Sequence, residues 1–162
     1  MPVLISDANI LIDMQCGGVL DRMFRLDQEF AVLDILFEEE LRDDHPELPG
    51  LGLQTLSLQA EYVDRGIKLI DEYRRTGASS NDLLSLALAM QEKCPLLTGD
   101  RRLRELCEEL GHETHGTLWL MNEMYRAGLL SRAEATAAYD AMRAQGRRLP
   151  WQEVSEQLRR MG

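Results

Sequence analysis

The chain has 162 residues, of which 44% are hydrophobic and 28% charged, the size and composition of one soluble domain with a hydrophobic core. A formal net charge of −10 argues against a protein that coats nucleic acid or anionic membrane by bulk attraction, although metal ions and local arginines can still receive a phosphate. Three cysteines without metal-site or redox spacing, no signal-peptide pattern and no apolar run of membrane-spanning length predict a cytoplasmic protein with free thiols and no membrane contact.

The first half of the chain alternates short apolar runs with helical patterns. Val3-Leu4-Ile5 is predicted to be a buried parallel strand, and Asp7 follows at its carboxyl end. Residues 10–26 have a helical pattern that Gly17-Gly18 interrupts. The next predicted elements are a strand at 29–33, a helix at 35–42 that carries Glu38-Glu39-Glu40, a loop at 43–52, an edge strand at 53–58 and a helix at about 59–75.

The second half repeats this alternation and then becomes helical. A helix is predicted to begin after Ser79, and residues 95–100 read as a short buried strand that ends in Asp100. The remaining predicted elements are a helix that ends at Gly111, a strand at about 113–115, and helices at 117–127, from the Ser131-x-x-Glu134 capping box to Gly146, and after Pro150. This pattern predicts an α/β fold, a parallel sheet wrapped by helices through right-handed crossovers.

Acidic residues follow two of the predicted strands. Asp7 and Asp100 should lie at the same edge of the sheet, and Asp82 lies in the first turn of the helix that leads into the second of these strands. Each acid also has a local interpretation, as a helix cap or, for the three glutamates, as a solvated helix face. Several carboxylates at one edge repel one another unless a cation neutralises them, and oxygen ligands suit Mg²⁺ or Mn²⁺.

The order of these motifs resembles the PIN domain, especially the small prokaryotic members that include the toxin ribonucleases of toxin–antitoxin pairs. The resemblance covers roughly residues 3–116. It rests on Leu4-Ile5-Ser6-Asp7-Ala8-Asn9, the acidic helix after the second strand, Ser79-Ser80-Asn81-Asp82 with the helix that it opens, and Leu96-Leu97-Thr98-Gly99-Asp100-Arg101. It implies a three-layer α/β/α fold with a central parallel sheet of four to five strands at 1–116, and a helical carboxyl-terminal extension at 117–162 packed on the same domain.

The resemblance also implies an activity, a Mg²⁺- or Mn²⁺-dependent endoribonuclease. Asp7, Glu39, Asp82 and Asp100 would hold the metal and activate the attacking water. Counting six residues from Leu33 gives Glu39, whereas counting from Asp34 gives Glu40; we choose Glu39 and leave Glu40 open. The resemblance also implies supporting residues and partners: Asn9, which would orient the first aspartate, Thr98, a hydroxyl behind the ligands, RNA as substrate, an antitoxin protein and a second copy in a homodimer. Independently of the resemblance, Arg101, Arg102 and Arg104 lie beside Asp100 and would offset the net charge of −10 locally.

Other α/β proteins also place an aspartate after the first strand. A haloacid-dehalogenase-like phosphatase needs a second acid two residues on, where this chain has Asn9, and both that class and the phosphoacceptor receivers need a lysine after a late strand, which neither Lys68 nor Lys93 provides. A non-catalytic PIN-like module that binds RNA or protein remains the alternative, and a structural scaffold the third. Binding of Mn²⁺ distinguishes a nuclease from both.

Overall fold

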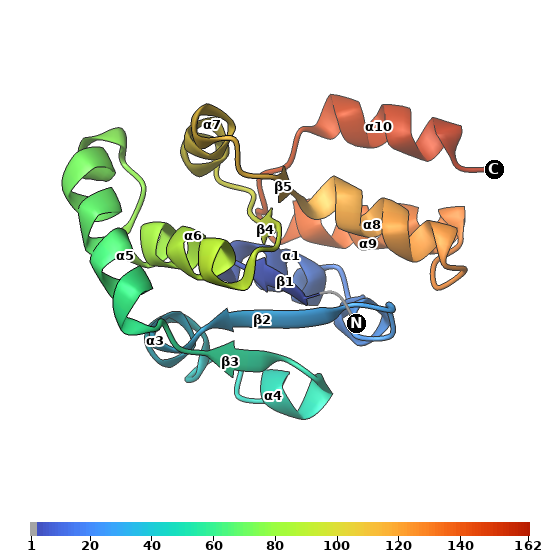
Figure 1. The fold of residues 1–162 in the computed structure, drawn as a ribbon. Helices are drawn as coiled ribbons and strands as arrows, with labels where there is room; N and C mark the ends of the chain where they lie inside the picture. Colours follow the sequence, from blue (N-terminus) through green and yellow to red (C-terminus); the bar gives the residue numbers. More distant parts are fainter. Residues whose placement is uncertain (1–2) are drawn as a thin grey trace.

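The structure is a computed structural model that describes residues 3–162, so the predicted boundary at residue 1 lies outside it. Its centre is a sheet of five parallel strands in the order β3-β2-β1-β4-β5 (Figure 1). The strands are β1 (Val3–Ser6), β2 (Glu29–Leu33), β3 (Gln54–Leu56), β4 (Leu96–Leu97) and β5 (Thr114–His115). This confirms the predicted parallel α/β fold, with the upper number of strands.

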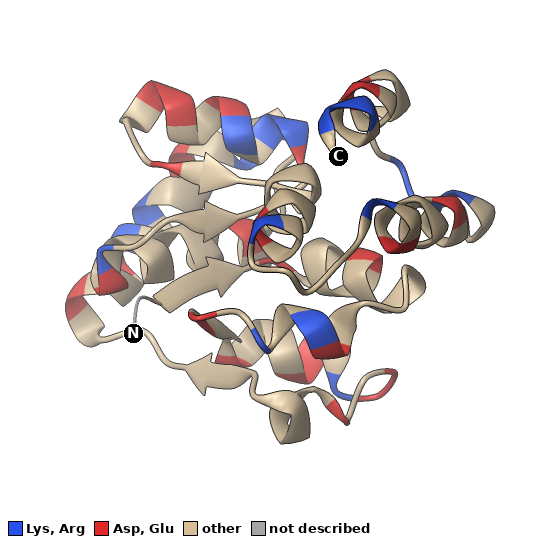
Figure 2. Ribbon diagram, turned by 90° about the vertical axis from the view of Figure 1, so that its right-hand side faces the viewer, with Lys and Arg blue, Asp and Glu red and all other residues tan. Residues whose placement is uncertain are grey.

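Apolar composition explains which strands lie in the middle. The central strands β1, β2 and β4 consist almost wholly of buried apolar residues, and Ile5 pairs with both Ala31 and Leu96. The edge strand β3 instead exposes both Gln54 and Thr55, so it is an edge strand as predicted, but its exposure does not alternate over these three residues. Figure 2 accordingly shows a sheet almost free of charge, with acidic and basic residues interspersed over the helices around it.

Helices cover both faces of the sheet (Figure 1). The right-handed rule for parallel crossovers places α1 and α6 on opposite faces, and α6 contacts β1, β2 and β4. The helical elements are α1 (Ala8–Cys16), α2 (Leu20–Met23), α3 (Asp34–Leu36), a π-helical turn (Phe37–Leu41), α4 (Leu48–Leu51), α5 (Ala60–Tyr73), a 3₁₀ turn (Arg74–Thr76), α6 (Ser80–Glu92), α7 (Arg101–Leu110), α8 (Thr117–Arg126), α9 (Arg132–Ala144) and α10 (Trp151–Arg160).

The strand order reverses between β1 and β4. The chain moves from β1 outward to β2 and β3, and then crosses back to β4 on the other side of β1. In open parallel sheets, the crevice at the carboxyl ends of the strands beside such a reversal is where ligands bind. The residues that leave these two strands are Asp7 and, after Thr98 and Gly99, Asp100.

Two segments differ from the prediction. The predicted loop at 43–52 contains α4, because Pro49 fits the first turn of a helix and Gly52, at φ 127°, ends it. The predicted helix at 35–42 is α-helical only in its first residues and continues as the π-helical turn. This wider turn carries Glu38, Glu39 and Glu40.

The last three helices share the core of the sheet domain. Helix α9 packs against α1 and α10 against α9, while the Tyr139 hydroxyl donates to Gln157 Oε1 at 2.6 Å and Gln157 Nε2 donates to the Leu118 carbonyl at 2.8 Å. The predicted capping box of Ser131 and Glu134 is present at the start of α9. Across residues 3–162, no helix has the length and apolar character needed to cross a membrane.

Candidate active site

Asp7 is the most buried acid of the predicted set. It lies directly after β1, is 1% exposed, and caps α1 because its Oδ1 accepts a hydrogen bond from the Ile10 amide at 3.0 Å. Its other oxygen, Oδ2, accepts from the Thr98 hydroxyl at 2.6 Å. The carboxylate is thereby fixed between the amino terminus of α1 and the end of β4.

Burial raises the pKa of Asp7 from 3.8 to about 6, although the hydrogen bonds from Thr98 and Ile10 act in the opposite direction. The nearby charge of Asp82 raises this pKa further. A neighbouring cation would strongly stabilise the ionised form of a carboxyl group in such an environment.

Asp100 lies on the same edge of the sheet, at the start of α7. Its Oδ1 accepts from the amides of Arg102 at 2.8 Å and Leu103 at 3.4 Å, so it is a helix cap. The Thr98 hydroxyl that donates to Asp7 also accepts from the Asp100 amide at 3.1 Å. Thr98 is fully buried, and this one side chain fixes the position of both acids relative to each other.

Asp82 lies in the first turn of α6, where its amide donates to the Ser79 hydroxyl at 3.1 Å. Burial raises the pKa of Asp82, and the charges of Asp100 and Glu40 raise it further against the hydrogen bonds from Ser79. These electrostatic effects link Asp82 to Asp7, to Asp100 and to the acidic turn. Asp82 therefore lies within electrostatic reach of the two aspartates at the strand reversal.

The glutamates reach this site through Asn81. Its side-chain amide donates to Glu40 Oε2 at 2.8 Å and to Glu39 Oε2 at 3.2 Å, across about forty residues of sequence. Of the two, Glu40 is the one whose charge raises the pKa of Asp82. A π-helical turn shifts side chains relative to an ordinary helix, and such turns are frequent at functional sites. The contacts therefore favour Glu40 over Glu39 as the acid nearer the aspartates.

The donor set fits a hard divalent cation. In the part of the chain that the structure describes, none of these five acids forms an ion pair with Lys, Arg or His, so their mutual repulsion is uncompensated. Within that same part, no three acidic, His or Cys side chains lie close enough together to enclose a metal directly. Mg²⁺ usually keeps several water ligands and binds through one or two carboxylates, which suits an open site of this kind.

The side chain of Asn9 contacts Arg147 rather than the carboxylate of Asp7, which it was expected to orient. Its Oδ1 accepts from Arg147 Nη2 at 3.3 Å, and the hydrogen bonds of the Asp7 carboxylate come from other residues. Arg101 is largely exposed, pairs with Glu105 at 3.0 Å along α7, and lines the same cleft as Asp100.

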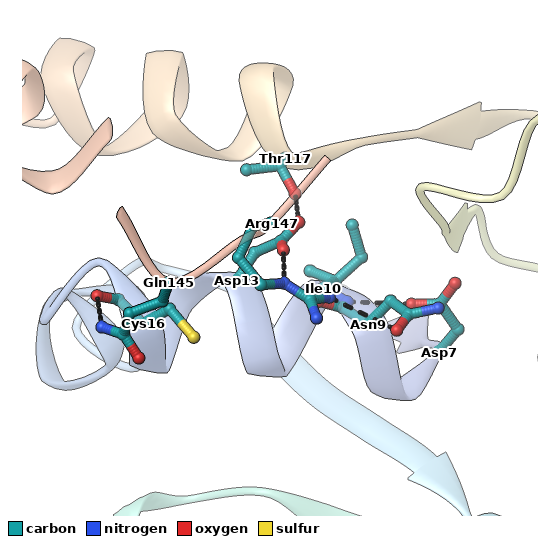
Figure 3. Close-up of polar contacts among 8 residues, drawn as sticks. All are labelled: Asp7, Asn9, Ile10, Asp13, Cys16, Thr117, Gln145 and Arg147. Carbon is teal, nitrogen blue, oxygen red and sulfur yellow. Dashed lines mark hydrogen bonds and ion pairs between the residues drawn. The ribbon is translucent and has the colours of Figure 1, made fainter. Parts of the chain in front are cut away.

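A polar cluster that the sequence motifs did not predict lies one and a half turns along α1. Asp13 is 4% exposed, accepts from Arg147 Nε at 2.6 Å through Oδ1, and accepts from the Thr117 hydroxyl at 2.7 Å through Oδ2 (Figure 3). Arg147 lies 134 residues away, in the segment between α9 and α10. A lone acid within an apolar helix, Ile10-Leu11-Ile12-Asp13-Met14, is the signal that points to a buried partner.

Of the five acids, Asp100 borders a cleft of about 1050 Å³. Thr98, Gly99 and Asp100 form the part of its wall nearest the site, and α7, the start of α8 and residues 146–150 form the rest. In its sheet order and in the acids at its strand reversal, the molecule is a PIN-like α/β domain.

Comparisons with known proteins agree with this class. Residues 3–162 match the family model described as DUF3368, a PIN domain, so the match includes the carboxyl-terminal helices. The chain belongs to this PIN domain family. A similar solved structure is VapBC2 from Rickettsia felis bound to a DNA fragment from its promoter, at 14% identity and a TM-score of 0.51, covering 70% of this chain and 98% of that one. No curated protein matches the chain.

Proposed function

We propose that the protein is a Mg²⁺- or Mn²⁺-dependent endoribonuclease that hydrolyses phosphodiester bonds of RNA. The observation that carries this proposal is the placement of Asp7 and Asp100 at the strand reversal, where the Thr98 hydroxyl contacts both residues, with Asp82 within electrostatic reach. None of the three has a cationic partner among the described residues. Membership of a PIN domain family supports it. The metal, when bound, activates a water and stabilises charge on the phosphate.

The chain's own residues would hold and orient this site. Asp7, Asp82 and Asp100 would bind the metal, with Glu39 as the acid proposed from sequence and Glu40 as the one that the contacts favour. Thr98 would hold Asp7 and Asp100 in place relative to each other, because its hydroxyl donates to the Asp7 carboxylate and accepts from the Asp100 amide. Asn9 and Arg101 would act on the substrate side of the site, Asn9 at the start of α1 and Arg101 at the start of α7.

An antitoxin protein and a second copy of this chain are the proposed partners in the cytoplasm. The similar solved structure is a VapBC2 complex, which supports the antitoxin proposal. Light scattering on the purified chain, alone and after co-expression with a candidate antitoxin encoded beside it, tests both partners. A homodimer is expected for the chain alone.

The test of activity is cleavage of a panel of single-stranded and hairpin RNAs in Mn²⁺, compared with EDTA and with Asp82→Asn. We expect cleavage that EDTA abolishes and that Asp82→Asn reduces by at least a hundredfold. Digestion that neither control changes comes from a contaminant. No cleavage together with no Mn²⁺ binding would contradict the proposal and leave the non-catalytic PIN-like module that binds RNA or protein.

A further inference from the structure

The segment between α9 and α10 reaches the first turn of α1 through one side chain. Arg147 donates from Nε to Asp13 Oδ1 at 2.6 Å, and from Nη2 to Asn9 Oδ1 at 3.3 Å and to the Asn9 carbonyl at 3.4 Å (Figure 3). Asn9 lies two residues after Asp7, and it lines the same cleft as Arg147 and Asp100. The carboxyl-terminal part of the chain therefore contacts a residue beside the acids.

Arg147 is held in place from two directions. Asp13 is 4% exposed and accepts a second hydrogen bond, from the Thr117 hydroxyl at the start of α8 at 2.7 Å. Gln145 Nε2 donates to the Cys16 carbonyl at 2.9 Å and ties the same segment to the other end of α1. Because the Arg147 side chain is only 23% exposed and paired with a buried acid, its position is set before any ligand binds.

The contact with Arg147 decides which way the Asn9 carboxamide faces. A guanidinium carries only donors, so the group of Asn9 that faces it must be the acceptor Oδ1. The Nδ2 group, with its two donors, consequently lies on the side away from Arg147. Among residues 3–162 no group accepts a hydrogen bond from Asn9 Nδ2, and Asn9 is exposed at the cleft. The amide therefore offers two uncommitted N–H donors two residues after Asp7.

We propose that Arg147 is a positioning residue of the nuclease, which fixes the Asn9 carboxamide so that Nδ2 donates to a phosphodiester oxygen of the substrate. The inference rests on the proposed function, which places Asn9 on the substrate side of the site. A donor that is fixed beforehand and aimed at an oxygen that gains charge in the transition state stabilises that state more than it stabilises the bound substrate. Through Arg147 the carboxyl-terminal segment contributes to the active site as well as to the core.

The first test is the kinetics of RNA cleavage in Mn²⁺ by Arg147→Lys, Asn9→Ala and the double variant. Lysine keeps a positive charge beside Asp13 but lacks the planar donor fork that also reaches Asn9. Asn9→Ala should lower kcat about a hundredfold, and Arg147→Lys, which leaves the amide present but free to rotate, about tenfold, with KM changed less than about twofold. Arg143→Lys, at an exposed arginine of α9 outside the cleft, is the matched control and should leave kcat unchanged.

The double variant shows whether Arg147 acts through Asn9. In the Asn9→Ala background, Arg147→Lys should lower kcat by less than about twofold, because the amide that it positions is gone. A merely structural role of Arg147 would instead give the same tenfold loss in both backgrounds.

A second measurement follows the amide without any cleavage. The chain contains three asparagines, Asn9, Asn81 and Asn122, so the side-chain signals of Asn9 in an NMR spectrum of ¹⁵N-labelled protein can be assigned from their loss in Asn9→Ala. In EDTA, Arg147→Lys should shift the Nδ2 proton signals of Asn9 and leave those of Asn122, on α8, unchanged.

These outcomes separate the role of Arg147 from the nuclease proposal. A wild type that cleaves RNA, with Arg147→Lys equally fast or with multiplicative losses in the double variant, would overturn the inference and leave the nuclease proposal standing. A wild type that cleaves no RNA would contradict the nuclease proposal, and unchanged Asn9 signals in Arg147→Lys would then overturn the positioning role as well. Shifted signals without cleavage would keep the positioning of the amide by Arg147 and assign it to a non-catalytic binding module.

Discussion

Asp7 serves two purposes that conflict at neutral pH. As the cap of α1 it stabilises the fold, but its burial makes the ionised form costly. The difference between 3.8 and about 6 corresponds to about 3 kcal/mol at about 1.4 kcal/mol per pKa unit. Because the pKa of Asp7 is higher in the folded state than in the unfolded state, the protonated carboxyl contributes this free energy of unfolding at acidic pH. The contribution is lost as the pH rises through 6.

Asp7→Asn should therefore increase the free energy of unfolding at pH 7 while abolishing RNA cleavage. The expected gain is about 1–3 kcal/mol, since the neutral amide avoids the cost of a buried charge. Urea unfolding of the variant and of the wild type, measured at pH 7 and again near pH 4.5, checks this, and the difference between them should shrink at the lower pH. A variant that is less stable at pH 7 would show that Asp7 is not strained by its charge.

Thr98 is expected to act through the pKa of Asp7. Its hydroxyl lowers that pKa, so Thr98→Val should raise it and move the acid limb of the pH dependence of kcat/KM to higher pH. Thr98→Ser keeps a hydroxyl and should restore the wild-type profile. An unchanged profile in Thr98→Val would mean that Asp7 does not titrate in the acid limb.

Glu39 and Glu40 can be compared directly, because the same substitution to Gln can be made at each. Glu40→Gln should reduce cleavage by at least about tenfold, whereas Glu39→Gln should reduce it by less than about threefold, because the charge of Glu40 raises the pKa of Asp82 and Asn81 lies closer to Glu40 than to Glu39. Both residues are exposed, so neither variant should unfold the protein, and circular dichroism verifies this. The reverse order of effects would select Glu39, the residue chosen from the sequence.

At the scale of elements, β1, β2 and β4 were predictable because each is a short, mainly apolar run, whereas β3 and β5 are polar at most of their positions. β2, Glu29–Leu33, lies where its pattern places it. The shape of the acidic turn was not predictable, since a π-helical turn has the same composition as the first turns of an ordinary helix. For this reason the sequence alone did not decide whether Glu39 or Glu40 is the acid of the site.

The contact between Asp13 and Arg147 also could not be predicted from the sequence. Local patterns describe neighbours a few residues apart, and these two side chains are 134 residues apart. The aspartates at the ends of β1 and β4 were easier to place, because parallel strands bring their carboxyl ends together whatever the intervening length.

We expect the Asp13–Arg147 pair to hold the carboxyl-terminal segment to α1. Arg147→Ala leaves Asp13 buried with only the Thr117 hydroxyl, so it should cost about 3 kcal/mol of unfolding free energy. A double-mutant cycle with Asp13→Asn should give a coupling energy above about 1 kcal/mol. Arg126→Ala, which loses an exposed pair with Glu123, is the control and should change stability by less than about 0.5 kcal/mol. Additive effects of the two changes would show that the pair does not act as a unit.

For the whole molecule, the net charge is −10, and the acids of the site have no ion-pair partner among residues 3–162, so the proposed function depends on a bound cation. A metal that binds only the folded chain adds to its stability, and its binding requires ionised carboxylates. The affinity should therefore increase with pH as Asp7, whose pKa is about 6, loses its proton.

The measurement that tests this most directly is calorimetric titration of the protein with Mn²⁺ at pH 7, beside Asp7→Asn and Asp82→Asn. The wild type should bind Mn²⁺ in a saturable way, and each variant should bind at least about tenfold more weakly. Binding should also weaken at pH 5.5. A wild type that binds no Mn²⁺, or variants that bind it equally well, would mean that these aspartates are helix caps, and the account of a metal-dependent nuclease would be wrong.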